Sequence, residues 1–180
     1  MSKSEVFYEE PQQESPLSII LSIAFVVFWT IIFSYVYSVF LVYSPMFEIN
    51  FIACFAFGIS IAYGVKIAVS IFPIYKSNTA FKLSIIAVLF GVYFSWAFYM
   101  LLFISENAIF HHQLHEYTYV LNPINWINLL IEISNQGLWS VFGATFTGAI
   151  LWFIWLIEAS IIIAVTIGLN IESNVAIYSK

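Results

Sequence analysis

Two ionisable residues interrupt long apolar stretches of this 180-residue chain, and they are the first candidates for chemistry. Lys66 lies within residues 47–75, and Glu158 lies within residues 144–169. An ionisable group at membrane depth is costly against lipid, so it usually faces a bundle interior, a water-filled cavity or a partner. The sequence therefore predicts an intramembrane polar pair of Lys66 and Glu158, direct or water-mediated, with backbones roughly 9 Å apart in depth.

Each member of this pair also has an interpretation without pairing. The Lys66 side chain can carry its amine along the helix toward water. Glu158 can be a protonated carboxyl that is hydrogen-bonded among helices, or it can belong to a proton or ion pathway. The residue types alone leave these alternatives open.

Metal-capable side chains gather in one place, the sequence HHQLHE at residues 111–116. On a helix His111 and His115 would face the same way, and two such histidines can hold zinc or another divalent ion. Histidines outside the bilayer can also act as a pH sensor or simply lie in the wet interface. Membrane desaturases need several separated histidine boxes, and three histidines in the chain exclude that chemistry.

Other catalytic constellations lack their residues. The ten acidic residues are all Glu and the five basic residues are all Lys, so Mg²⁺ sites built on Asp and phosphate clamps built on Arg are absent. Cys54 is the only cysteine, which excludes an internal disulfide. A net charge of −5 gives no basic surface for nucleic acid. We expect neither a cofactor nor a nucleic-acid partner.

The composition indicates which elements hold these residues. Hydrophobic residues make up 62% of the chain and charged residues 8%, whereas a soluble domain has about 25% charged residues. A membrane-spanning helix needs about 20 mainly apolar residues. Four segments satisfy this: 17–43, 47–75, 81–104 and 144–169. The sequence predicts an all-α integral membrane four-helix bundle in contact with a lipid bilayer.

Residues 105–143 form the one long connection, a hairpin between the third and fourth spans. Asn122 as a cap, Pro123 at the first helical position and Gly137 as a stop predict a helix over 123–136. It carries a narrow polar stripe on an apolar helix: Asn125, Asn128, Glu132 and Asn135. This amphipathic pattern predicts a helix lying in the membrane interface. A helix packed over the bundle and a re-entrant hairpin are the alternatives.

The stretch NPINWINLLIEISNQGLWS, residues 122–140, carries a resemblance. It resembles a segment of uncharacterised small polytopic bacterial membrane proteins, with an Asn-Pro start, an early aromatic residue and a Gly-x-Trp-Ser ending before the last span. The resemblance implies a bacterial origin and a cell inner membrane. It implies no function and transfers no site residues.

Lysines set the expected orientation. Lys76 and Lys82 flank the second connection, and Lys3 and Lys180 lie in the two tails, whereas residues 105–143 contain none. The positive-inside rule predicts that both termini are cytoplasmic and that the long hairpin is not. Residues 1–16 are then a disordered acidic cytoplasmic tail, and residues 170–180 form a second cytoplasmic tail.

Small residues at four-residue spacing indicate where helices approach closely in lipid. Residues 47–75 carry two such ladders on nearly opposite sides, which favours a central helix. The residues of the candidate packing interface are Ser60, Gly64, Ala68, Ser160, Ala164 and Gly168. These residues could pack within the bundle or against a second copy of the chain.

Three functional hypotheses follow. The leading one is a non-enzymatic membrane subunit or assembly partner, which associates with itself or with another membrane protein. The second is a channel or transporter component that uses Glu158 and Lys66. The third is a metal-dependent membrane enzyme that uses His111 and His115.

Overall fold

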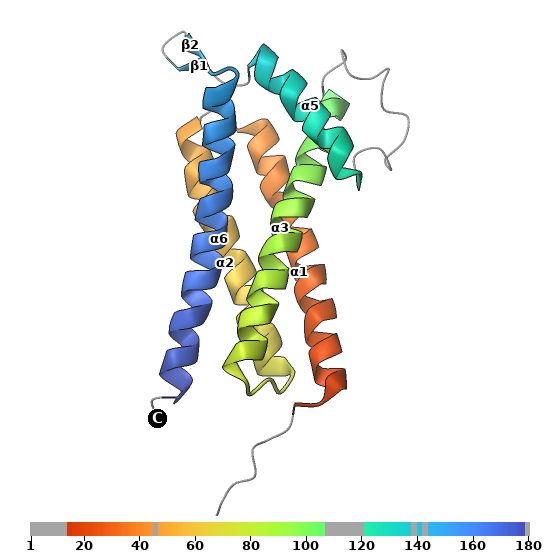
Figure 1. Cartoon of the computed structure of the whole chain (residues 1–180), viewed down its shortest axis with the longest axis vertical. Coiled ribbons are helices and arrows are strands. Elements are labelled where there is room, and N and C mark those ends of the chain that lie inside the picture. Colours follow the sequence, from red (N-terminus) through yellow and green to blue (C-terminus); the bar gives the residue numbers. More distant parts are fainter. Residues whose placement is uncertain (1–13, 45–46, 107–120, 138–139, 142–143, 179–180) are drawn as a thin grey trace, which may run out of the picture.

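The computed structural model describes residues 14–44, 47–106, 121–137, 140–141 and 144–178 (Figure 1). The described elements are five helices and one short antiparallel hairpin of strands. In chain order they are α1 (Pro16–Tyr43), α2 (Phe47–Ile71), α3 (Ser77–Glu106), α5 (Pro123–Gln136), β1 (Ser140–Val141), β2 (Ala144–Thr145) and α6 (Ala149–Tyr178).

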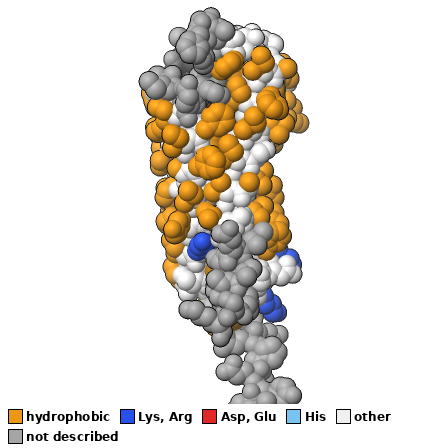
Figure 2. Space-filling view, turned by 90° about the vertical axis from the view of Figure 1, so that its left-hand side faces the viewer, with side chains coloured by type: hydrophobic (Ala, Val, Ile, Leu, Met, Phe, Trp, Pro, Cys, Tyr) orange, Lys and Arg blue, Asp and Glu red, His pale blue; other side chains and the backbone are white. Residues whose placement is uncertain are grey.

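Four of the helices, α1, α2, α3 and α6, are long and apolar enough to cross a membrane. They stand side by side, and α1 and α3 run in one direction while α2 and α6 run in the other (Figure 1). Apolar side chains cover much of the face in Figure 2, and the lysines in view lie near its lower end. The prediction of an all-α chain with four long apolar helices is confirmed.

The start of the last span differs from the prediction. Helix α6 begins at Ala149 rather than at 144, because residues 144–145 pair with β1 and Gly148 follows with a φ of 55°. A positive φ is readily adopted by glycine and breaks helical geometry. The Gly148 amide donates to Ser134 O at 2.7 Å, which fixes the start of α6 against the end of α5.

Helix α5 occupies the residues that its capping signals predict. The Asn122 side chain accepts from the Ile124 amide, and the helix ends at Gly137, where φ is 84°. Its buried residues are Leu129, Leu130, Ile133 and Ser134. The Tyr93 hydroxyl of α3 donates to Leu121 O, just before the helix. These contacts hold α5 at the end of the bundle where the hairpin of strands also lies (Figure 1).

The seam between α1 and α3 is built from small polar residues. Every fourth residue of α1 from Ser22 to Ser38 is buried, and four of these five positions are Ser or Thr. The Ser34 hydroxyl donates to Gly91 O at 3.2 Å, and the Ser38 hydroxyl donates to Ser95 O at 2.8 Å. Small side chains let helix backbones approach and form such bonds in lipid. This seam was not among the predicted packing faces, which lay in the second and fourth spans.

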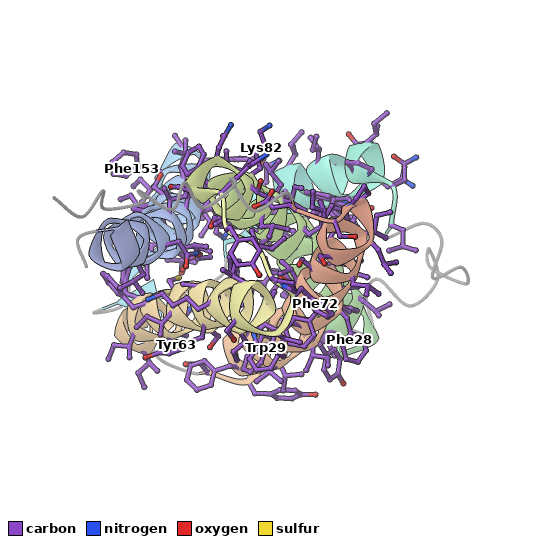
Figure 3. All side chains as sticks on the ribbon, turned by 90° about the horizontal axis from the view of Figure 1, so that it is seen from below. Phe28, Trp29, Tyr63, Phe72, Lys82 and Phe153 are labelled. Atoms are coloured by element: carbon purple, nitrogen blue, oxygen red, sulfur yellow. The ribbon has the colours of Figure 1, made fainter. Side chains whose placement is uncertain are left out.

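Helix α2 contacts neighbours on two sides. A Cβ placed on Gly64 would overlap the indole ring of Trp29 of α1, and the Trp29 indole donates to Ser60 O at 2.9 Å (Figure 3). On another face, the Thr166 hydroxyl of α6 donates to Gly58 O at 3.1 Å. Two residues of the candidate packing interface, Ser60 and Gly64, therefore contact Trp29 of α1 within the chain.

The ladder of α6 lies elsewhere. Ser160, Ala164 and Gly168 are all exposed, and a Cβ on Gly168 would meet nothing within 4 Å. On that side the described residues leave the Gly168 backbone open. The two ladders that the sequence grouped together have different environments.

One side chain ties the segment before α1 to the start of α3. The Glu14 carboxylate accepts from the amides of Tyr75 and Lys76, at 2.9 and 2.6 Å, and from the Thr79 hydroxyl at 2.7 Å. Burial raises the pKa of Glu14, but these hydrogen bonds and the Lys76 charge together outweigh it and hold the pKa below 4.5. A carboxylate at a helix N-terminus also meets the favourable end of the helix dipole.

We expect Gly91→Leu to destabilise the bundle by about 1–3 kcal/mol, because overpacking displaces buried neighbours. A Cβ at Gly91 would already lie 2.7 Å from Ile61 Cδ1 and 3.3 Å from Thr30 Cγ2. Thermal unfolding in detergent measures the effect, with Gly168→Leu as the control in an open position. Equal melting temperatures for the two variants would contradict this packing.

We expect Glu14→Gln to lower stability by about 1–3 kcal/mol at neutral pH, since hydrogen bonds to a charged acceptor are lost. The folded state binds the Glu14 proton less tightly than the unfolded state does. Its stabilisation is therefore complete above pH 4.5 and is lost as the pH falls through the lowered pKa. The free energy of unfolding of the wild type and of Glu14→Gln is measured from pH 7 to pH 3. The difference between the two proteins should shrink only at the acid end of this range. Glu132→Gln, at an exposed position, is the control and should unfold like the wild type.

Candidate functional site

Glu158 lies on the face of α6 that points into the bundle. Its side chain is 4% exposed, and the residues one turn to either side, Trp155 and Ile162, are also buried. Glu158 Oε1 has no hydrogen-bond partner among the described residues. A buried, unpaired carboxyl oxygen is costly, because burial removes water without replacing its hydrogen bonds. Glu158 is therefore the centre of the candidate site.

A small cavity adjoins this carboxyl between α1, α3 and α6. Its volume is about 20 Å³, which is enough for one water molecule. The lining is mainly apolar and aromatic, from Tyr37, Leu41, Val92, Ser95, Trp96, Tyr99, Trp155, Glu158, Ala159 and Ile162. Trp96 and Trp155 meet edge to face, with ring centroids 5.4 Å apart. The cavity combines one acidic group with several aromatic rings.

Tyr37 lies between this cavity and the outer surface of the bundle. Its hydroxyl lies 3.0 Å from Cys54 Sγ, and its ring stacks on Phe57 with centroids 4.5 Å apart. It also lines an apolar groove of about 340 Å³ between α1 and α2, whose lining includes the exposed residues Val36 and Phe40. One side chain thus borders both the inner cavity and a groove on the apolar surface.

The structure does not bring Lys66 and Glu158 together. Lys66 Nζ lies 5.7 Å from the centroid of the Tyr63 ring on its own helix. The hydrogen bond between Thr166 and Gly58 O sets these two residues at one level on the parallel helices α6 and α2. Lys66 follows Gly58 by eight residues, whereas Glu158 precedes Thr166 by eight. Helix rises of ~1.5 Å per residue then separate the two in depth by on the order of 20 Å. The depth difference between Lys66 and Glu158 that was predicted from the sequence is smaller, because that prediction places the start of the last helix at residue 144.

Asn50 is a buried polar residue that the sequence analysis did not single out. It is fully buried on α2, and neither its Nδ2 nor its Oδ1 has a hydrogen-bond partner in the described chain. It precedes Cys54 by four residues, so the two share a face of the helix. An amide within an apolar span, one turn from the only cysteine, was the signal that could have identified it.

The predicted histidine site lies outside the described residues, since His111 and His115 fall in 107–120. Within the described part of the chain, no three His, Cys, Asp or Glu side chains are grouped to hold a metal ion. The metal hypothesis therefore stays a prediction.

The chain was compared with protein-family models, with curated proteins and with solved structures. None of the three comparisons gave a match. The resemblance over residues 122–140 therefore also stays a prediction.

Proposed function

We propose that this protein is a component of a membrane channel or transporter, in which Glu158 binds the transported proton or small cation. The observation that carries the proposal is the buried Oε1 of Glu158, which has no hydrogen-bond partner in the described part of the chain and lies beside a cavity of about 20 Å³. An ionisable group within a membrane span is typical of ion and proton pathways.

The charge of the Glu158 carboxyl limits what can lie beside it. An ionised carboxylate with an unpaired oxygen is strongly disfavoured away from water, so it needs a proton, a cation or a hydrogen-bond donor. The cavity has room for one water-sized guest next to the carboxyl. Uptake and release of a proton or cation at Glu158 would be one step of transport.

The proposed orientation follows from the lysines. Lys76 and Lys82 lie in or beside the connection between α2 and α3, at the end of the bundle where α1 begins and α6 ends (Figure 1). The positive-inside rule assigns that end to the cytoplasm. Both termini are then cytoplasmic, in the cell membrane of a bacterium. Glu158 lies nine residues after Ala149, the first residue of α6. It is therefore roughly 14 Å from the end of α6 that faces away from the cytoplasm in this orientation.

Helix α5 fits the interfacial position in this orientation. It exposes an apolar stripe of Ile124, Ile127 and Ile131, in addition to the face that packs on the bundle. The polar residues Asn128, Glu132 and Asn135 are exposed beside this stripe. Such a helix can place the isoleucines in lipid and the polar residues in water.

We expect purified protein in lipid vesicles to conduct protons or monovalent cations along an imposed gradient. Glu158→Gln should reduce this flux at least tenfold, because the amide has no charge to hold a cation and no acidic proton to release. Glu132→Gln, an exposed position on α5, is the matched control and should retain the flux. Undiminished flux through Glu158→Gln would contradict the proposal.

A second candidate function is that of a membrane assembly partner, alone or within the same transporter. The observation that favours it is the exposed ladder of Ser160, Ala164 and Gly168 on α6, where a Cβ added to Gly168 would meet no atom of the described residues within 4 Å. Small residues at this spacing let two membrane helices pack closely. A second copy of the chain would cover this face.

Native mass spectrometry of the protein in nanodiscs tests the assembly. We expect a defined oligomer for the wild type and a monomer for Gly168→Leu, whose melting temperature should fall little because a Cβ there meets nothing within 4 Å. Gly64→Leu should instead destabilise the fold itself, because Trp29 covers that position. An unchanged oligomer in Gly168→Leu would count against this interface.

A further inference from the structure

An apolar groove runs along the outer surface of the bundle between α1 and α2, and the described residues give it a volume of about 340 Å³. On α1 it is lined by large side chains, from Phe33 to Phe40. On α2 the lining includes Ala53, Ala56 and Ser60, whose spacings of three and four residues place small side chains on one face. The short side chains of α2 beside the long ones of α1 account for the hollow.

Two contacts fix the register of these antiparallel helices along the groove. The Trp29 indole donates to Ser60 O at 2.9 Å, and the Tyr37 hydroxyl lies 3.0 Å from Cys54 Sγ. The groove therefore extends from the level of Ser60 toward the end of the bundle where α1 ends and α2 begins, the same end as α5 (Figure 1).

The two ends of the groove differ. At the deep end Trp29 lies across the junction of the helices, because its indole covers Gly64 of α2 and packs on Phe33 of α1 with ring centroids 4.9 Å apart (Figure 3). At the other end Phe40 is exposed, three residues before Tyr43, the last residue of α1. An exposed tyrosine at the end of a span is typical of the membrane interface. The groove is thus closed inside the membrane and open toward the headgroups.

The length of the groove matches one leaflet. Phe33 and Phe40 are seven residues apart, so the groove is roughly 10 Å long on α1. The hydrocarbon core of a bilayer is about 30 Å thick, so each leaflet contributes about 15 Å. The groove begins near one end of the span and stops near its middle, and it follows the helix axes, which is also the mean direction of lipid chains.

The hydroxyl groups of the lining are already paired within the protein. Tyr37 contacts Cys54 Sγ, and the Ser60 hydroxyl donates to Ala56 O at 2.8 Å. The Tyr37 ring stacks on Phe57 with centroids 4.5 Å apart, which gives the groove an aromatic floor. A guest in this groove is therefore held by van der Waals contact and not by hydrogen bonds. This environment suits a hydrocarbon chain.

The width of the groove favours a lipid chain over a helix of a second copy. A volume of about 340 Å³ along roughly 10 Å corresponds to a mean cross-section of roughly 30 Å², about a third of that of a helix with its side chains. Carbon atoms in contact lie about 4 Å apart, so a single hydrocarbon chain fits this section.

We propose that the groove between α1 and α2 binds one acyl chain of a bilayer phospholipid, from the leaflet on the α5 side, with the chain end directed toward Trp29. No lysine lies among residues 4–65, so the chain is recognised and not the charge of the headgroup. The bound chain lies against Tyr37, which also lines the cavity of Glu158. The inference goes beyond the proposed function and does not depend on the role of Glu158.

Native mass spectrometry of the purified full-length protein, released from detergent micelles that contain dioleoyl phosphatidylcholine, tests the site. We expect one lipid to stay bound to the wild type under activation that removes the other lipids. Dioleoyl phosphatidylglycerol should be retained to the same extent, because the headgroup is not recognised.

A pair of matched variants separates binding from folding. Ala56→Trp fills the groove from an exposed position, so it should lose the retained lipid while melting within a few degrees of the wild type. Ala149→Trp adds the same side chain at an exposed alanine of α6 outside the groove, and it should keep the lipid.

Photolabelling of the wild type gives a readout that needs no variant. A phosphatidylcholine with a diazirine in the middle of one chain is activated in vesicles, and the labelled residues are identified by mass spectrometry. We expect the label to concentrate on residues 33–40 and 52–60. An even distribution over the exposed faces of the four spans would overturn the proposal.

Three other results would also overturn it. These are no retained lipid in the wild type, equal retention in Ala56→Trp, and a dimer of the wild type that Ala56→Trp dissociates, which would assign the groove to a second copy of the chain. A retained lipid that distinguishes the two headgroups would overturn the assignment to the chain alone.

Discussion

Close backbone approach between small residues is the interaction on which the rest of this structure depends. In a bilayer, apolar side chains gain little by leaving lipid for the protein interior, so helices associate through van der Waals packing and short hydrogen bonds. The α1–α3 seam meets this requirement with serine hydroxyls that donate to the carbonyls of Gly91 and Ser95. Gly64 and Gly58 allow α2 to pack against α1 and α6 in the same way.

This packing also explains why polar groups can remain buried within the bundle without a hydrogen-bond partner among the described residues. The bond between Thr166 and Gly58 fixes the register of two parallel helices, and that register holds Asn50 and Glu158 at one level. Helices held at several points along their length cannot rotate to bring one buried group to water without breaking other contacts. The scaffold therefore keeps these polar groups buried where they are.

The candidate site was predictable in part. Glu158 stands out in the sequence because a carboxylate in an apolar run has few structural reasons to be there. The predicted pairing of Glu158 with Lys66 was harder to infer. The depth of each side chain in the bundle depends on where its helix begins and on the register between helices. Residues 144–145 form a strand, α6 begins at Ala149, and Lys66 lies beside Tyr63. Asn50 was missed because an uncharged amide gives a weak signal until its burial is known.

Hydropathy and capping residues act locally along the chain, so the four long apolar helices, the bounds of α5 and a carboxyl within an apolar span could all be predicted from the sequence. The tertiary structure decided which small-residue faces are covered, since Gly64 meets Trp29 while Gly168 meets nothing within 4 Å. It also decided that Glu158 shares its level with Asn50 and not with Lys66. These outcomes depend on the direction and register of neighbouring helices, which arise from contacts between residues far apart in the sequence.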